Sequence, residues 1–276
     1  MLNTDHSPDA ETVYRQVESY LALEPVRRNL ILTLLDHRVN SAQAPAGSYW
    51  WTTQGEFVVG FAMQSPIGFK GLLCASSPEV VESLARSIHR TSSGLPAIAG
   101  EARAAARFAG AWTDLSGGSA KPLEGERLYQ LDSIQQPATP GSARLATLHD
   151  VPTLIDWHIG FCSDVGTEPY PDPFEAIASG VKNQRFWVWE MGNIVAMAAV
   201  TKPFAGASRI SHVYTPPQER GKGYGAGVTA AATSNALMAG ADTCLLYTQL
   251  ANATSNSIYR RIGYRSVEER LTYELG

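Results

Sequence analysis

The chain has few cysteines, few charges and no long apolar run, and each shortage excludes a class of protein. It has only three cysteines, at positions 74, 162 and 244, widely separated and mostly inside apolar runs, which fits reduced thiols and not a disulfide framework or a metal site. A net charge of −4 without a Lys/Arg run offers no footprint for nucleic acid. Residues 1–11 are polar and no stretch reaches membrane length. We therefore expect a cytoplasmic protein with reduced thiols that binds no metal, nucleic acid or membrane.

A hydrophobic content of 44% over 276 residues allows one large or two ordinary domains. The segment QQPATPGS at 135–142 is rich in proline and small residues, which is typical of a linker. It predicts a first domain over 1–134 and a second over 143–276. Both halves read as helices followed by strands and further helices, so we expect an internal repeat of mixed α/β units.

Periodicity predicts the elements of the first half. A helical pattern over 11–38 is interrupted at Pro25, and 48–74 contains three short runs of strand-forming residues. A helix begins at Ser77-Pro78, with Val80, Val81, Leu84 and Ile88 as its buried stripe. We also expect a strand at 96–99, a helix over 101–112 and a strand over 127–134.

In the second half, the expected helices cover 150–161, 174–181 and 255–262, in addition to the helix that follows the glycine-rich turn described next. The expected strands cover 143–147, 186–190, 194–201, 208–215, 243–248, 264–267 and 271–275.

The segment from Val213 to Gly227, VYTPPQERGKGYGAG, joins a strand to a helix of small residues. Pro216 and Pro217 end the strand, and three glycines then open the helix, whose first amides lack carbonyl partners. Glycines let a backbone approach a phosphate closely, and the helix dipole favours an anion there. The segment predicts a phosphate-binding turn.

Three alternatives compete at this turn. A P-loop fails because Lys222 precedes Gly223. A dinucleotide fingerprint is met by Gly221, Gly223 and Ala226, with Asp242 about twenty residues on, but Asp242 precedes a strand instead of ending one. A turn without a ligand remains the third alternative.

Arg220, Gly223 and Gly225 have the RxxGxG spacing of an acyl-CoA motif, and the chain resembles the GNAT superfamily of N-acetyltransferases there. A second block, from Asn252 to the pair Gly263-Tyr264, is similar to that family's next motif. The resemblance implies an α/β (mixed α+β) fold of two GNAT-like units, each with a central, mostly antiparallel mixed sheet flanked by helices. The first unit has CASSPEVV where the second has the glycines, so the resemblance is to a tandem GNAT with a degenerate first unit.

The resemblance also implies acetyl-CoA as the acyl-donor cosubstrate. Its pyrophosphate would lie on the turn and its pantetheine arm along the end of the preceding strand. The implied cofactor-binding residues are Val213, Tyr214, Thr215, Arg220, Gly221, Lys222, Gly223, Tyr224, Gly225, Asn252 and Asn256. Capping of the following helix is the alternative role for the two asparagines. Tyr259 holds the family's position for the general acid, and core packing is its alternative role.

The strand before the turn carries no carboxylate, so the sequence specifies no general base. His212 is one candidate, the acidic loop residues Asp164, Glu168 and Asp172 are others, and a base acting through water is equally open. Trp157, Phe161 and Tyr170 predict an aromatic wall for the acceptor, although Trp157 and Phe161 are also spaced for core packing.

The function expected from these motifs is acetyl transfer from acetyl-CoA to a primary amine of a small molecule, by direct transfer in a ternary complex. Two other functions remain: an acyl-CoA-binding sensor or scaffold without turnover, and a nicotinamide-dependent oxidoreductase.

Overall fold

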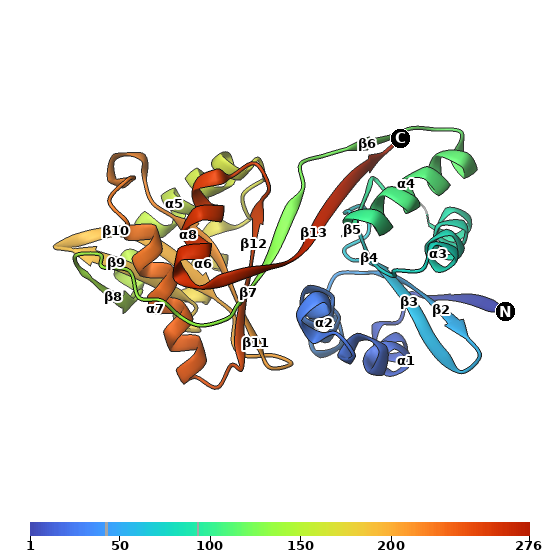
Figure 1. Cartoon of the computed structure of the whole chain (residues 1–276), viewed down its shortest axis with the longest axis horizontal. Coiled ribbons are helices and arrows are strands. Elements are labelled where there is room, and N and C mark those ends of the chain that lie inside the picture. Colours follow the sequence, from blue (N-terminus) through green and yellow to red (C-terminus); the bar gives the residue numbers. More distant parts are fainter. Residues whose placement is uncertain (42–43, 93) are drawn as a thin grey trace. The chain divides into compact units, whose positions relative to one another are not determined.

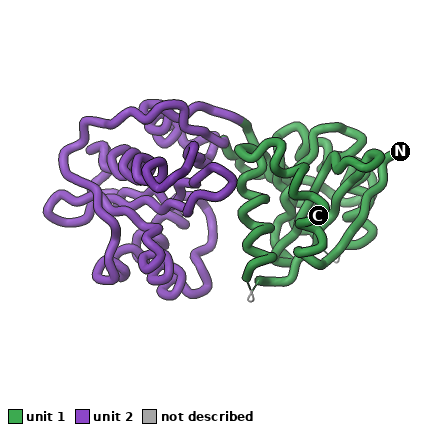
Figure 2. The backbone as a smooth tube through the Cα atoms, turned by 90° about the horizontal axis from the view of Figure 1, so that it is seen from below, with its two compact units in different colours: residues 1–127, 268–276 green, residues 128–267 purple. Residues whose placement is uncertain are grey.

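The computed structural model describes residues 1–41, 44–92 and 94–276, and it divides into two compact units (Figure 2). Unit 1 comprises residues 1–127 and 268–276, and unit 2 comprises residues 128–267. The chain therefore leaves unit 1 once and returns to it at its end. The linker at 135–142 predicts a second domain that runs on through residue 276, whereas residues 268–276 belong to unit 1.

Unit 1 contains a mixed sheet with the strand order β1-β2-β3-β4-β5-β13, and β6 pairs with β13 (Figure 1). Its helices are α1 (Ala10–Ala22), α2 (Pro25–Asn40), α3 (Pro78–Thr91) and α4 (Ala102–Ser116). Its strands are β1 (Leu2–Ser7), β2 (Ser48–Gln54), β3 (Phe57–Gln64), β4 (Gly71–Cys74), β5 (Ala97–Glu101), β6 (Ala120–Pro122) and the end of β13 (Tyr264–Leu275).

The predicted buried stripe of α3 is confirmed, because all four of its apolar residues are buried. The break between α1 and α2 at Pro25 is confirmed too, since proline opens the second helix. Two strands were missed. β1 is a polar segment that pairs antiparallel with β2 at the sheet edge, and β6 lies between the helix expected over 101–112 and the strand expected over 127–134.

In unit 2 the strands are ordered β13-β7-β12-β11-β10-β9-β8. Its helices are α5 (Val151–Val165), α6 (Pro173–Lys182), α7 (Tyr224–Met238) and α8 (Ala253–Ile262). Its strands are β7 (Glu126–Leu131), β8 (Ser142–Leu145), β9 (Phe186–Met191), β10 (Asn193–Val200), β11 (Ala207–Tyr214), β12 (Thr243–Gln249) and the start of β13. β11 and β12 are parallel and are joined through α7, whereas β8 to β11 pair antiparallel.

The long strand β13 belongs to both units. Its residues up to 267 lie in unit 2, and its residues from Arg270 to Glu274 pair antiparallel with β5 in unit 1. Sequence analysis expected two short strands here, at 264–267 and 271–275. The segment between them, SVEE, contains no glycine or proline, so nothing in it breaks the extended backbone.

The core of unit 2 forms around α7, whose small residues let it lie close to the sheet. At Gly227 an added Cβ would meet the indole of Trp189 at 3.0 Å, so even one methyl group would crowd this packing. The indole nitrogen of Trp189 donates to the carbonyl of Pro140 at 2.8 Å and so holds the segment before β8 against the unit. This packing fixes where α7 begins, which is where the glycine-rich turn lies.

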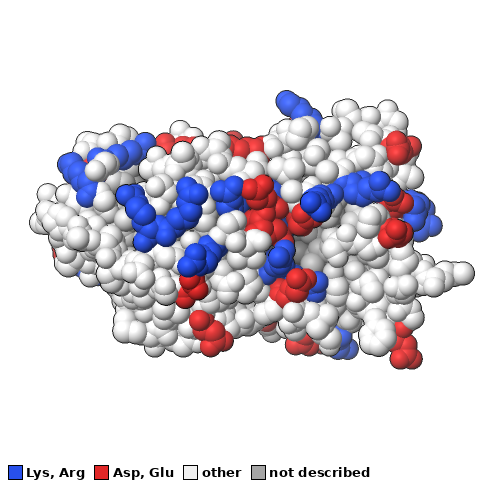
Figure 3. Space-filling model, in the orientation of Figure 1, with Lys and Arg blue, Asp and Glu red and all other residues white. Residues whose placement is uncertain are grey.

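On the visible face of each unit, acidic and basic side chains are interspersed among larger uncharged areas (Figure 3). In the described part of the chain, none of the helices combines the length and the apolar composition that crossing a membrane requires.

Candidate active site

The glycine-rich turn adopts a backbone conformation that requires glycine at two positions. Gly221 and Gly223 have φ values of 80° and 86°, in the left-handed region that strains residues with a Cβ. Gly223 is the N-cap of α7 and no side chain caps that helix. The amides of its first turn therefore have no capping acceptor, which is the arrangement that suits an anion.

The two cations of the turn are paired with carboxylates. A terminal nitrogen of Arg220 lies 2.5 Å from Asp164 at the end of α5, and its Nε donates to the carbonyl of Thr215 at 2.9 Å. Lys222 Nζ lies 2.9 Å from Glu219. All four charged side chains remain at least partly accessible to solvent. An anion on the turn would therefore share these cations with their present partners.

β11 separates from β12 before it reaches the turn. The two strands pair only from Ala207 to Ile210, opposite Thr243 to Leu246. A β-bulge follows in β11. Ser211 pairs with Ala199 and Tyr214 pairs with Met197, so β11 has one residue more than β10 between these two pairs. Within the bulge, His212 has a φ of 50°. The edge of residues 213–215 that would face β12 lies beyond this pairing and leads directly into the turn. A chain with amide groups, such as the pantetheine arm, fits an edge of this kind.

Tyr259 lies in the core of unit 2 and is 6% exposed. Its ring packs near those of Tyr129 and Tyr264, with centroids 6.3 Å away in each case. Burial raises the pKa of Tyr259 to about 12, against a smaller opposing effect of Ser255. The phenol therefore stays protonated at neutral pH, as a proton donor must be.

Asn252 and Asn256 form hydrogen bonds within the protein. The side chain of Asn252 caps α8 by accepting from the amide of Ser255 at 2.9 Å. Asn256 donates to the carbonyls of Gln249 and Asn252 and accepts from the hydroxyl of Tyr129 at 2.8 Å. The capping role left open for Asn252 is thus present, and Asn256 ties the end of β12 to α8.

The three aromatic residues predicted for the acceptor site lie in different environments. Trp157 is buried, with its ring centroid 6.4 Å from that of Tyr214. Phe161 stacks on His212 at 5.1 Å, and Tyr170 places its hydroxyl 3.1 Å from Nε2 of the same histidine. Tyr170 alone of the three lines the cavity described next.

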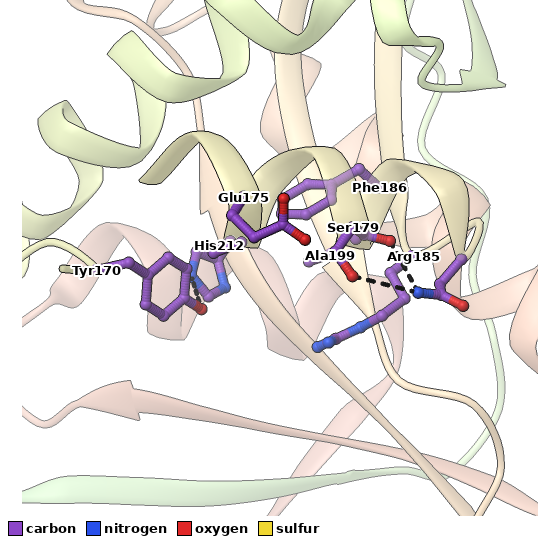
Figure 4. A pocket seen from close by; sticks show the side chains of 10 residues that line it. Tyr170, Glu175, Ser179, Arg185, Phe186, Ala199 and His212 are labelled. Atoms are coloured by element: carbon purple, nitrogen blue, oxygen red, sulfur yellow. Dashed lines mark hydrogen bonds between the residues drawn. The ribbon is translucent and has the colours of Figure 1, made fainter. Parts of the chain in front are cut away.

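A cavity of about 390 Å³ lies where α6, the start of β9 and the bulge of β11 meet (Figure 4). Its lining combines aromatic, charged and amide side chains. The lining residues are Tyr170, Glu175, Ala176, Ser179, Gly180, Asn183, Arg185, Phe186, Ala199 and His212. Sequence reasoning missed the residues that α6 and β9 contribute, because they belong to no motif and only the fold brings them beside β11.

His212 and His158 are both held as neutral rings. Burial, with smaller effects of His158 and Arg185, lowers the pKa of His212 to about 4. His158 is 1% exposed and its Nε2 accepts the backbone amide of Tyr170 at 3.1 Å, and burial lowers its pKa as well. The pair therefore positions Tyr170 without carrying charge at neutral pH.

Asp242 lies at the wrong end of the sheet for a dinucleotide ribose. Its amide donates to the carbonyl of Gly206 at 2.8 Å, beside the start of β11. The glycine-rich turn follows the opposite end of β11, because the two strands run parallel. The nicotinamide alternative therefore lacks its acidic partner at the turn.

Comparisons with known proteins agree with this geometry. Residues 191–272, which include the turn and the Asn252–Tyr264 block, match the family described as FR47-like protein. A search of the curated proteins finds no match.

Solved structures are similar over nearly the whole chain at low identity. An acetyltransferase of the GNAT family from Colwellia psychrerythraea has a TM-score of 0.63 at 14% identity, covering 100% of this chain and 99% of that one. A GCN5-related N-acetyltransferase from Sphaerobacter thermophilus has a TM-score of 0.62 at 13% identity, covering 99% and 94%. A tandem GNAT protein from the clavulanic acid biosynthesis pathway has a TM-score of 0.60 at 11% identity, covering 99% and 98%.

These likenesses confirm the mixed α/β fold and the resemblance read from the two motifs. The fold and the FR47-like match to residues 191–272 make the chain similar to proteins of the GNAT superfamily.

Proposed function

We propose that unit 2 binds acetyl-CoA and transfers the acetyl group directly to a primary amine of a small molecule within a ternary complex. The observation that carries this proposal is the uncapped start of α7 beside the strand end that β12 does not cover. The amides from Arg220 to Gly225 would hold the pyrophosphate. The backbone from Val213 to Thr215 would bind the pantetheine arm.

In the reaction, a bond forms between the amine nitrogen and the acyl carbon while the carbon–sulfur bond breaks. Acetyl-CoA supplies the activated acyl group. Tyr259 would donate a proton to the departing thiolate, and its high pKa keeps that proton available at neutral pH. β11 carries no carboxylate, so the amine proton would pass to neutral His212 or to water.

The experiment compares two buried tyrosines that pack against each other. Tyr259→Phe removes the proposed acid, whereas Tyr264→Phe removes a hydroxyl 2.7 Å from that of Thr233 in the same core. We expect thiol release from acetyl-CoA in the presence of an amine to fall at least 100-fold in Tyr259→Phe only, with acetyl-CoA binding retained in both. Equal rates per folded molecule in the two variants would remove Tyr259 from the mechanism.

A second candidate function is an acyl-CoA sensor without turnover. The near-complete burial of Tyr259 and the absence of a carboxylate on β11 favour it. Binding of acetyl-CoA without thiol release, across a broad panel of amines, would establish the sensor in place of the transferase.

We also propose that unit 1 binds no coenzyme A. Around the start of α3 the sequence is CASSPEVV, without the glycines or cations of unit 2. In addition, the hydroxyl of Tyr20 donates to the carbonyl of Cys74 at 3.0 Å and occupies the end of β4. One binding site per chain is therefore expected.

A further inference from the structure

Two opposite charges line the cavity of unit 2. Glu175 lies on α6, and Arg185 immediately precedes β9. Both side chains are exposed, and within the described ranges of the chain neither forms an ion pair. In Figure 4 the carboxylate of Glu175 and the guanidinium of Arg185 both reach toward the middle of the cavity. A ligand with one group of each sign could pair with both.

His212 marks the end of the cavity at which acyl transfer would take place. This residue lies at the bulge of β11, directly before the strand end proposed to bind the pantetheine arm. An amine that reaches a thioester there must lie near His212 and the hydroxyl of Tyr170, which are 3.1 Å apart. Because His212 is neutral, the acid that attracts a protonated amine to the cavity is Glu175.

The opposite end of the cavity suits a carboxylate. Arg185 presents a planar group that binds carboxylates in a bidentate manner. Near it, the amide nitrogen of Asn183 donates to the carbonyl of Ser179 at 2.9 Å, so that side chain is already oriented. The amide of Arg185 donates to the carbonyl of Gly180 at 2.9 Å, which fixes its backbone against α6. The guanidinium of Arg185 therefore extends from a backbone position that is held against α6.

We propose that the acceptor is an amino-acid-like molecule, with its amine between Glu175 and His212 and its carboxylate on Arg185. This inference rests on the proposed acyl transfer. A cavity of about 390 Å³ is within the range of small-molecule sites, and the rings of Tyr170 and Phe186 would contact an apolar side chain.

The test measures binding directly, by calorimetry, with matched pairs of ligands that differ only in the carboxylate. The pairs are glycine and methylamine, L-phenylalanine and 2-phenylethylamine, and L-ornithine and putrescine, each with saturating desulfo-CoA. In the wild type we expect the carboxylated member of the best-bound pair to bind at least tenfold more tightly.

Three variants separate the roles of the charges. Arg185→Gln should abolish the preference by weakening only the carboxylated ligand about tenfold, and Glu175→Gln should weaken both members of a pair alike. Lys182→Gln is the control, because it removes an exposed cation on the same helix that does not line the cavity.

The proposal is wrong if no pair shows the preference in the wild type, or if Arg185→Gln behaves like Lys182→Gln. A separate result would show that the proposed acyl transfer, and not the carboxylate preference, is wrong. If desulfo-CoA and acetyl-CoA do not bind, the proposed function is wrong, while the ligand pairs alone still report whether Arg185 selects a carboxylate.

Discussion

The hydroxyl of Tyr170 lies 3.1 Å from Nε2 of His212, which joins the loop before α6 to the bulge of β11. The histidine ring is also stacked on Phe161 at 5.1 Å, and His158 holds the backbone of Tyr170. His158 and Phe161 of α5, Tyr170 of the following loop and His212 of β11 thereby form one wall beside the proposed reaction centre.

This wall should make folding sensitive to mild acid. Burial lowers the pKa of His212 to about 4 from the usual 6.5 of histidine, so the native state resists protonation that the unfolded chain accepts. The neutral ring of His212 contributes fully to stability above pH 6.5, and this contribution is lost as pH falls toward 4. The contribution to the free energy of unfolding is on the order of 3 kcal/mol at most. Chemical denaturation at pH 7 and pH 4.5 should show the loss in the wild type and a smaller one in His212→Asn. An equal loss in both proteins would contradict the assignment.

A second acid-sensitive group lies at the start of α5. The carboxylate of Asp150 accepts hydrogen bonds from both terminal nitrogens of Arg144, at 2.8 and 3.0 Å, and from the backbone amide of Thr147. The hydrogen bonds from Arg144 lower the pKa of Asp150 to about 2, so its contribution is present above pH 3.8 and is lost as pH falls toward 2. Asp150→Asn should reduce the free energy of unfolding at pH 7 by about 2 kcal/mol.

The control for that variant is Asp156→Asn, an exposed acid on the same helix. It should change stability by less than about 0.5 kcal/mol. Urea titration of the two proteins measures both values, and equal stabilities would show that the Arg144 pair contributes nothing.

Two helix glycines should respond oppositely to alanine. A Cβ at Gly160 in α5 would collide with the phenol of Tyr214 at the end of β11, whereas a Cβ at Gly110 in α4 meets no atom within 4 Å. Gly160→Ala should destabilise the protein by about 1–3 kcal/mol, and Gly110→Ala should stabilise it by about 0.5–1 kcal/mol. Thermal unfolding reports both, and the collision is refuted if the two variants shift the transition in the same direction.

Local signals predicted most of the fold. Element boundaries are marked by Pro25, by Ser77-Pro78 and by the short runs of strand-forming residues over 48–74, all of which act through near neighbours in sequence. The shared strand β13 could not be predicted in this way. Its partners β5 and β7 are more than 130 residues away in sequence, and pairing at that range leaves no periodic pattern.

The residues of the candidate site also differ in whether local sequence could predict them. The glycine-rich turn was predictable because positive φ at Gly221 and Gly223 demands glycine locally. Arg185 and Glu175 were not, since a single exposed charge looks like any solvated residue until the fold closes a cavity around it. The partner of Arg220 was also missed, because this ion pair depends on where Asp164 at the end of α5 lies.

The measurement that tests the central claim most directly is calorimetric titration with acetyl-CoA of two glutamate variants at opposite ends of α7. Gly221 and Gly240 have φ values of 80° and 97°, and a Cβ at either meets nothing within 4 Å, so the backbone strain is matched. We predict one site per chain in the wild type and in Gly240→Glu, and affinity at least 100-fold weaker in Gly221→Glu, where a carboxylate would face the pyrophosphate. Unchanged binding in Gly221→Glu, or no binding in the wild type, would contradict the account.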